Sequence, residues 1–286
     1  MRVLPMVGTG ALVIVLAGNH VSGAMQEPGG PARVSIRHTD VSIDTMVEGD
    51  GPAIVLIPSL ARGSEDYGEV SAGLAHAGYR VLRPQPRGIG GSVGPLAKVT
   101  LHDFARDIAE VIRHSGGGRA VVVGHAYGNW VARMTATDYP DLVRGVVIAA
   151  AAAREYDRGL STDVTKAGDP TLPDADRLAA LQRAFFAPGN DPKVWLGGWH
   201  PEVRERQRAA AAAVPRSAWW SAGRAPILEM QGEYDPFKPP NTRRELTDEL
   251  GSRVTVVVIR NASHALFPEQ PRAAVEALRR WISGLL

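Results

Sequence analysis

Two segments that directly follow strand-like runs carry residue types that could do chemistry. Asp235 comes just after the run 226–232, and His264 comes just after the run 253–259. Histidine is the side chain most often used to move protons in enzymes, because its pKa lies near neutral pH. The two segments are therefore candidates for acid–base chemistry. Glu233, in the same loop as Asp235, is a second candidate carboxylate.

A third segment, 124–128, has the form G-x-A-x-G and joins the β-branched run 119–123 to a helix-like stretch. In the pattern G-x-S-x-G, the middle residue is a serine nucleophile held on a strained strand-to-helix turn. The glycines allow neighbouring backbone to approach too closely for a Cβ atom. Ala126 has a methyl group where that hydroxyl would be. The segment therefore predicts the scaffold for a nucleophile without the nucleophile.

The elements around these segments alternate between strand and helix patterns. Continuous apolar runs at 53–57 and 142–153 have the composition of strands that are covered on both faces. The alternation from 53 to 153 favours a parallel sheet with right-handed crossovers. A loosely alternating stretch at 34–47 predicts an opening antiparallel hairpin, and Ser64 is expected to cap the first helix.

The rhythm changes at residues 154–224, which have helix-like, alanine-rich pieces and no strand pattern. We interpret this stretch as an inserted helical cap over the carboxyl edge of the sheet. The expected fold is α/β, with a mostly parallel central sheet, helices on both faces and this cap. The core domain is expected to comprise 25–153 and 225–286. Trp195 and Trp199 of the cap either pack in the core between cap and sheet or contact a ligand.

Five motifs in order give the chain a resemblance to the α/β-hydrolase superfamily over nearly all of 34–286. They are the loop Pro58-Ser59-Leu60, the glycine-rich loop 86–92, the G-x-A-x-G turn, the loop 232–235 and the loop around His264. Each motif alone is weak, but their common order makes the resemblance specific. The pattern is similar to that of the capped hydrolases of small molecules.

The resemblance implies a role for each matching residue. His264 would be the general base or acid, and Asp235 would orient its imidazole, with Glu233 as the alternative acid. The backbone N–H groups of Leu60 and Tyr127 would form the oxyanion hole. The chain departs from the family pattern at Pro58-Ser59, where His-Gly is usual, and at Ala126.

Two neighbouring polar residues have alternative interpretations. Ser59 could be a displaced nucleophile near the mouth of the site, or a loop hydroxyl that satisfies backbone groups. His125 lies beside Ala126, but the geometry of the turn is expected to direct its side chain into the sheet. The spacing of the histidines fits no metal motif such as H-E-x-x-H. We therefore predict no metal site and no cofactor.

Composition and charge limit the possible partners. The 286 residues have a formal net charge of +2, no cysteine and no long basic block, which gives no reason to expect a nucleic-acid partner. Residues 1–24 have a basic start, a broken apolar run and small residues at 22–24, as in a secretory signal. We predict export to the periplasm or outside the cell, with no stable membrane insertion after cleavage. An uncleaved anchor is the alternative, and the oligomeric state is left open.

Alanine at the centre of the turn leaves three hypotheses for function. In the first, the protein is an enzyme that acts on a small, partly apolar molecule such as an ester or lactone, using His264 and Asp235 without a covalent intermediate. Elimination or cofactor-free oxygenation are related possibilities. In the second, a serine esterase has had its serine replaced by alanine at position 126. In the third, the protein is an inactive member of the fold that binds a ligand or a partner.

Overall fold

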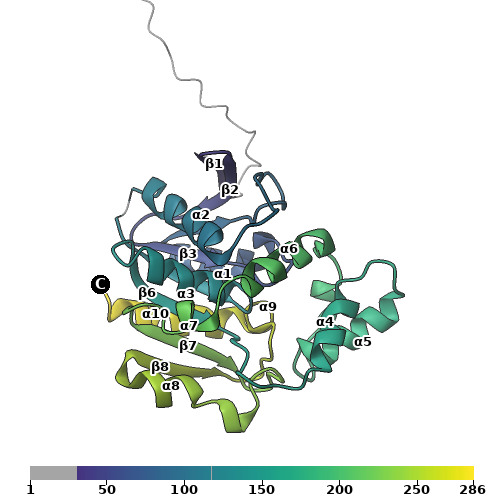
Figure 1. The fold of residues 1–286 in the computed structure, drawn as a ribbon. Coiled ribbons are helices and arrows are strands. Elements are labelled where there is room, and N and C mark those ends of the chain that lie inside the picture. The colour runs from purple at the N-terminus through teal and green to yellow at the C-terminus, as the bar shows by residue number, and fades with distance from the viewer. Residues whose placement is uncertain (1–30, 117) are drawn as a thin grey trace, which may run out of the picture. The chain divides into compact units, whose positions relative to one another are not determined.

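The computed structural model describes residues 31–116 and 118–286, and the predicted signal segment 1–24 lies outside this range. The described residues form an eight-stranded sheet with strand order β1-β2-β4-β3-β5-β6-β7-β8 (Figure 1). The expectation of a mostly parallel sheet with helices on both faces is confirmed. Within the described part of the chain, no helix combines the length and apolar composition needed to span a bilayer.

The sheet begins with the antiparallel hairpin that the sequence predicts. β1 (Ala32–His38) pairs with β2 (Val41–Glu48), and Ile36 lies opposite Ile43. Thr39 turns the chain with a φ of 48°. β2 also pairs antiparallel with β4 and so joins the hairpin to the parallel part of the sheet.

The remaining six strands are parallel. The central ones are short runs of β-branched residues that are buried along their whole length, as expected for strands with helices on both faces. The six strands are β3 (Ala53–Ile57), β4 (Arg80–Pro84), β5 (Ala120–His125), β6 (Val143–Ala149), β7 (Ile227–Gly232) and β8 (Val254–Ile259).

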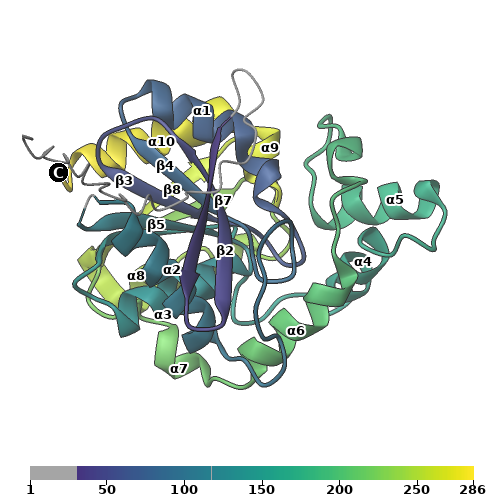
Figure 2. The ribbon, with the colours of Figure 1, turned by 90° about the horizontal axis from the view of Figure 1, so that it is seen from above.

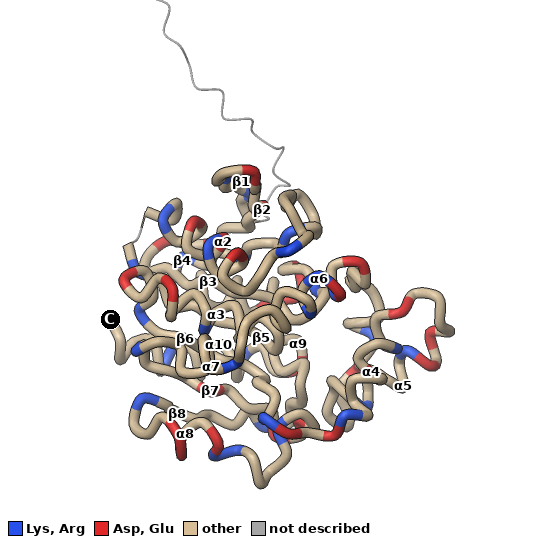
Figure 3. Tube along the Cα trace, viewed as in Figure 1, with Lys and Arg blue, Asp and Glu red and all other residues tan. Residues whose placement is uncertain are grey.

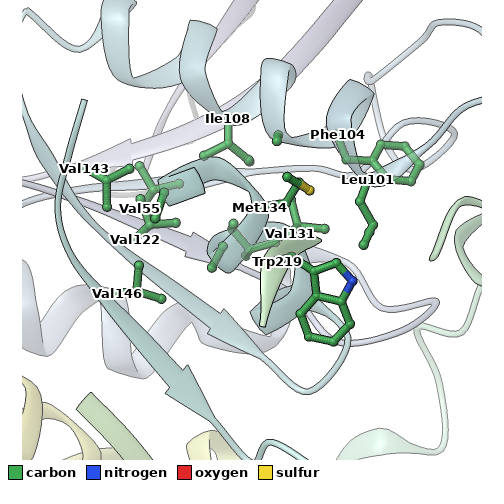
Figure 4. Packing of buried hydrophobic residues seen from close by; sticks show 14 of the residues in the cluster. Val55, Leu101, Phe104, Ile108, Val122, Val131, Met134, Val143, Val146 and Trp219 are labelled. Atoms are coloured by element: carbon green, nitrogen blue, oxygen red, sulfur yellow. The ribbon is translucent and has the colours of Figure 1, made fainter. Parts of the chain in front are cut away.

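Helices cover both faces of this sheet. Figure 2 shows α1 (Gly68–His76) and α10 (Pro271–Ser283) on one face, and α2 (Leu101–His114), α3 (Gly128–Asp138) and α8 (Glu245–Leu250) on the other. The core under α2 and α3 includes Phe104, Ile108, Val131 and Met134 packed on Val55 and Val122 (Figure 4). α9 (Leu266–Glu269) is a short helix between β8 and α10.

The chain between β6 and β7 consists of helices joined by loops and contributes no strand to the sheet. These are α4 (Leu160–Ala167), α5 (Asp174–Ala184), a 3-10 turn at Pro192–Trp195, α6 (Pro201–Ala212) and α7 (Arg216–Trp219). Trp219 of α7 stacks on Trp130 of α3, with ring centroids 5.4 Å apart. This helical segment is therefore in direct contact with the sheet domain.

Two local expectations need correction. Ser64 does not cap the first helix: it begins a 3-10 turn at Ser64–Tyr67 that precedes α1, and its hydroxyl donates to the carbonyl of Pro84 at 2.6 Å. The predicted strand 142–153 ends at Ala149, because Ala150 takes a left-handed conformation with a φ of 49°. The residues after Ala149 form a loop at the edge of the sheet instead.

The strand order brings the candidate segments to one edge. β3 pairs with β4 on one side and with β5 on the other, so the chain changes direction across the sheet between β3 and β5. Ligands bind outside the carboxyl ends of the strands at such a switch point. Ile57, the last residue of β3, lies opposite Gly124, so the loop with Ser59 and Leu60 begins beside the turn at Ala126.

Candidate active site

The turn at Ala126 is a tight strand-to-helix connection that depends on both of its glycines. Ala126 has a φ of 47°, in the left-handed region that L-residues seldom adopt. A Cβ atom on Gly124 would lie 2.3 Å from the carbonyl oxygen of Gly128. A Cβ atom on Gly128 would lie 2.5 Å from the carbonyl oxygen of Ile57. The turn is thus built as for a nucleophile, and it presents a methyl group.

The structure brings His264 and Asp235 together. The imidazole Nδ1 lies 3.1 and 3.0 Å from the two carboxylate oxygens of Asp235. The carboxylate is fully buried, and His264 is 6% exposed. A carboxylate accepts hydrogen bonds, so Nδ1 carries the proton and Nε2 is left as the basic nitrogen. This is the arrangement of a general base held by an acid.

The loop that carries Asp235 and the loop that carries His264 approach each other closely, and this holds the two side chains in contact. A Cβ atom on Gly232 would lie 2.3 Å from the carbonyl oxygen of Ser263, so only glycine lets the loop after β7 reach the loop after β8. Asp235 is held in turn by the amide of Phe237, which donates to its Oδ1 at 2.9 Å. Glu233 accepts a hydrogen bond from the amide of Asn261 and makes none with the imidazole. Asp235 is therefore the carboxylate that contacts His264.

His125 is fully buried and connects three loops of the site. Its Nε2 lies 2.7 Å from the carbonyl oxygen of His264, and its Nδ1 lies 2.9 Å from the hydroxyl of Tyr67, which accepts from the amide of Ser59. Burial, with a further contribution from His264, lowers the pKa of His125 from 6.5 to about 3. The neutral ring donates from Nε2 and accepts at Nδ1, so it orders these loops without carrying charge.

Leu60 and Tyr127, whose amides were predicted to form the oxyanion hole, lie together at the site. Both residues line the cavity above Ala126, and among the described residues neither N–H donates to another protein atom. The next residue, Ala61, donates its amide to the buried side chain of Gln207 at 2.8 Å and accepts from the amide of His200 at 3.0 Å. Residues between β6 and β7 therefore hold the loop that carries the Leu60 amide.

A cavity of about 260 Å³ opens in front of these groups. Its wall includes three of the sequence-predicted candidates near the turn, Ser59, Leu60 and Tyr127, together with Ala126, His264 and Trp199. The rest of the wall is mainly apolar and comprises Asn129, Trp130, Ala150, Ala152, Tyr156, Ser161, Val164, Phe185, Arg208 and Phe237. A cavity of this kind suits a small, partly apolar molecule.

Trp195 does not line this cavity, so its position does not support the interpretation of it as a substrate-binding residue. Its ring is 1% exposed and packs against Phe185 and the guanidinium of Arg62. Arg62 lies between the two tryptophans, 4.7 Å from each ring, and forms an ion pair with Asp66. Trp195 thus belongs to the buried contact between the helical segment and the sheet domain, whereas Trp199 reaches the cavity.

Three residues stand out among those of the cavity wall that the sequence did not single out. Asn129 follows the turn directly, and its side-chain oxygen is buried without a hydrogen-bond partner in the described structure. Phe237 packs on the imidazole of His264 with ring centroids 4.3 Å apart. Arg208 comes from α6. Asn129 lies three residues after Ala126, and Phe237 lies two residues after Asp235. Their closeness to these candidates was the only sequence signal for a place in the site.

No group of three or more metal-ligating side chains occurs among residues 31–116 and 118–286. The site as described consists of one imidazole–carboxylate pair, two backbone donors and a mainly apolar wall.

The model of the alpha/beta hydrolase family matches residues 54–278, and the chain belongs to this family. The match spans all the parallel strands and the segments that carry Ala126, Asp235 and His264.

Several relatives of known name match the chain at low identity. A 2-(acetamidomethylene)succinate hydrolase of Mesorhizobium japonicum is 24% identical over 85% of this chain and 92% of its own length. An epoxide hydrolase of Caballeronia sordidicola is 24% identical over 72% of this chain and 58% of its own length. These relatives are hydrolases.

Solved structures share the fold. A thermophilic esterase from Thermogutta terrifontis has a TM-score of 0.69 at 23% identity, covering 88% of this chain and 98% of its own. A bromoperoxidase from Bacillus anthracis has a TM-score of 0.70 at 21% identity, covering 88% of this chain and 99% of its own. At these identities the likeness concerns the fold alone.

Proposed function

We propose that this protein is a hydrolase that cleaves a small, partly apolar ester or lactone without a serine nucleophile. One observation carries the proposal: the buried His264–Asp235 pair is intact, and His264 lines the same cavity as Ala126. A protein that only binds a ligand has no need of a general base held by a buried carboxylate. Within the described structure the amides of Leu60 and Tyr127 donate to no other protein atom, which supports the same conclusion.

In the proposed reaction, His264 activates water in place of serine. A water molecule attacks the carbonyl carbon of the substrate and gives a proton to Nε2 of His264, while the carbonyl oxygen takes up negative charge at the two amides. The bond between carbon and the leaving oxygen then breaks, and the imidazolium returns the proton to the leaving alkoxide. Asp235 stabilises the imidazolium between the two steps and stays ionised.

Energetics restrict the substrate. Serine hydrolases that have lost triad members keep an acceleration of only roughly 10³–10⁴ over water, which comes from the oxyanion hole and from binding. His264 adds general base catalysis, typically worth about 10²–10⁴. The substrate is therefore expected to be an activated ester or a strained ring such as a lactone, where this acceleration suffices.

The main alternative is an inactive member of the family that binds a small ligand, and it is favoured by the methyl group of Ala126. A serine esterase whose serine was replaced at this position is the other alternative. Both enzyme hypotheses place a small molecule in the cavity, whereas an inactive member would bind either a small ligand there or a partner. Export to the periplasm or beyond remains a prediction from residues 1–24.

A screen of the unaltered protein separates enzyme from binder. Activated esters, lactones and epoxides are offered, turnover is followed over time, and binding is followed by the fluorescence of Trp130 and Trp199, which line the cavity. We expect steady turnover of at least one ester or lactone without a burst, since no acyl-enzyme forms. A ligand that changes the fluorescence and is never converted, across all classes, would favour the binding protein instead.

A further inference from the structure

The cavity that contains His264 has one permanently charged side chain in its wall, and this is Arg208. It projects from α6 and is exposed to solvent. Among the described residues it forms no ion pair, whereas the neighbouring Arg204 pairs with Glu205. An arginine at the wall of a pocket without an acidic partner is available to an anion of the ligand.

A second hollow, which shares lining residues with the cavity, adds positive charge beside it. It shares Tyr156 and Ser161 with the cavity, and its other lining residues are Arg154, Glu155, Arg158 and Arg216. Arg154 forms an ion pair with Glu249, whereas Arg158 and Arg216 form none in the described part of the chain. Because Glu249 offsets the charge of Arg154, Arg158 and Arg216 outweigh Glu155 around this opening, and the remaining positive charge attracts anions.

Besides Arg208, none of the residues that line the cavity in the described structure carries a permanent charge. The wall near the reacting groups is apolar and includes Trp130, Phe185 and Phe237. Burying a charged group of the ligand there without a partner would be unfavourable. The charged residues of α6 are three arginines and two glutamates, and Figure 3 shows both charge colours on this helix, so the helix as a whole is not a strongly basic surface. Arg208 differs from the other charged residues of α6 in lining the cavity.

The position of Arg208 relative to the reacting groups is fixed by its neighbour in the sequence. Gln207 is buried and accepts a hydrogen bond from the amide of Ala61, the residue after Leu60. The backbone that carries Arg208 is therefore tied to the loop of the oxyanion hole. Arg208, Leu60 and Tyr127 line the same cavity, so a single ligand in it can contact all three.

We propose that the substrate carries an anionic group, which Arg208 binds while the scissile carbonyl lies at the oxyanion amides. The proposal rests on the proposed function, because it concerns the same cavity. It limits the substrate class to esters or lactones that carry a carboxylate or phosphate group besides the scissile bond. Arg158 and Arg216 increase the rate of capture through their field and need not contact the anion.

The test uses methyl ketones, which hydrolases do not cleave, so that binding is read independently of turnover. The ligands are 5-oxohexanoate and 6-oxoheptanoate, their neutral primary amides and the phosphonate 4-oxopentylphosphonate, titrated by tryptophan fluorescence. We expect the oxo acids to bind about 5- to 10-fold more tightly than the amides at low salt, with the preference falling as salt is added. If the phosphonate binds more tightly than the oxo acids, the preferred anionic group is a phosphate. If the oxo acids bind more tightly, it is a carboxylate.

Matched variants locate the preference. In Arg208→Gln the acid and the amide should bind within about 2-fold of each other, while Arg206→Gln, an exposed arginine of the same helix that does not line the cavity, should keep the full preference. Equal binding of acid and amide by the unaltered protein would overturn the proposal, and so would a preference that survives Arg208→Gln. A protein that binds the acids but hydrolyses nothing would refute the proposed hydrolysis and leave this inference standing.

Discussion

Ala126→Ser is expected to raise the rate of hydrolysis of activated esters by at least about 10²-fold and to create a covalent intermediate. The backbone at this position already has the left-handed conformation of a nucleophile turn, and the side chain faces a cavity with room for one more oxygen. His264 lines the same cavity and can take the proton of the new hydroxyl. A full triad accelerates acyl transfer far more than the hole and binding alone.

The readouts are steady-state kinetics, a burst of product and labelling by a fluorophosphonate. Ala152→Ser is the control, because it adds a hydroxyl elsewhere in the wall of the same cavity. We expect neither labelling nor a burst from the control. If Ala126→Ser folds normally and remains unlabelled, His264 and the two amides do not form a competent hydrolase site.

Asp235→Asn is expected to reduce turnover by the unaltered site by roughly 10²–10⁴-fold while the protein stays folded. The asparagine amide can donate to Nδ1 of His264, which forces the proton onto Nε2 and removes the basic nitrogen from the cavity. The variant also loses the charge that stabilises the imidazolium. The effect should fall mainly on kcat, because Asp235 does not line the cavity.

The matched control is Glu233→Gln in the same loop. Glu233 accepts a hydrogen bond from the amide of Asn261 and does not contact the imidazole, so activity should remain within about 3-fold. A large loss in Glu233→Gln together with a small loss in Asp235→Asn would reverse the assignment of the acid.

The sequence was sufficient for the parts of the fold that depend on local pattern. β3 was predicted with its observed bounds, because a short β-branched run between two loops has few alternatives. Gly124, Gly128 and Gly232 were informative because close backbone approach excludes every other residue, and the structure shows these approaches directly. Asp235 and His264 were found because each follows a strand of one parallel sheet, and the ends of such strands meet at one edge.

The roles of residues that depend on tertiary contacts could not be predicted from the sequence. Trp195 and Trp199 are the same residue type four positions apart, and only the tertiary structure shows that Trp195 is buried while Trp199 lines the cavity. Arg208 lies beside an alanine-rich run with no motif, so its place in the wall required the path of α6. The hydroxyl of Ser64 was expected to form a local cap and instead bonds Pro84, 20 residues away.

The central claim is that His264, held by Asp235, still catalyses hydrolysis although no hydroxyl is present at position 126. The most direct measurement is kcat/KM on the best substrate of the screen for the unaltered protein, for His264→Gln and for His76→Ala, an exposed histidine on α1. Glutamine can keep a hydrogen bond to Asp235 but cannot act as a base. We predict a loss of roughly 10²–10⁴-fold in His264→Gln and no more than about 2-fold in His76→Ala. Equal activity of folded His264→Gln and the unaltered protein would contradict the claim.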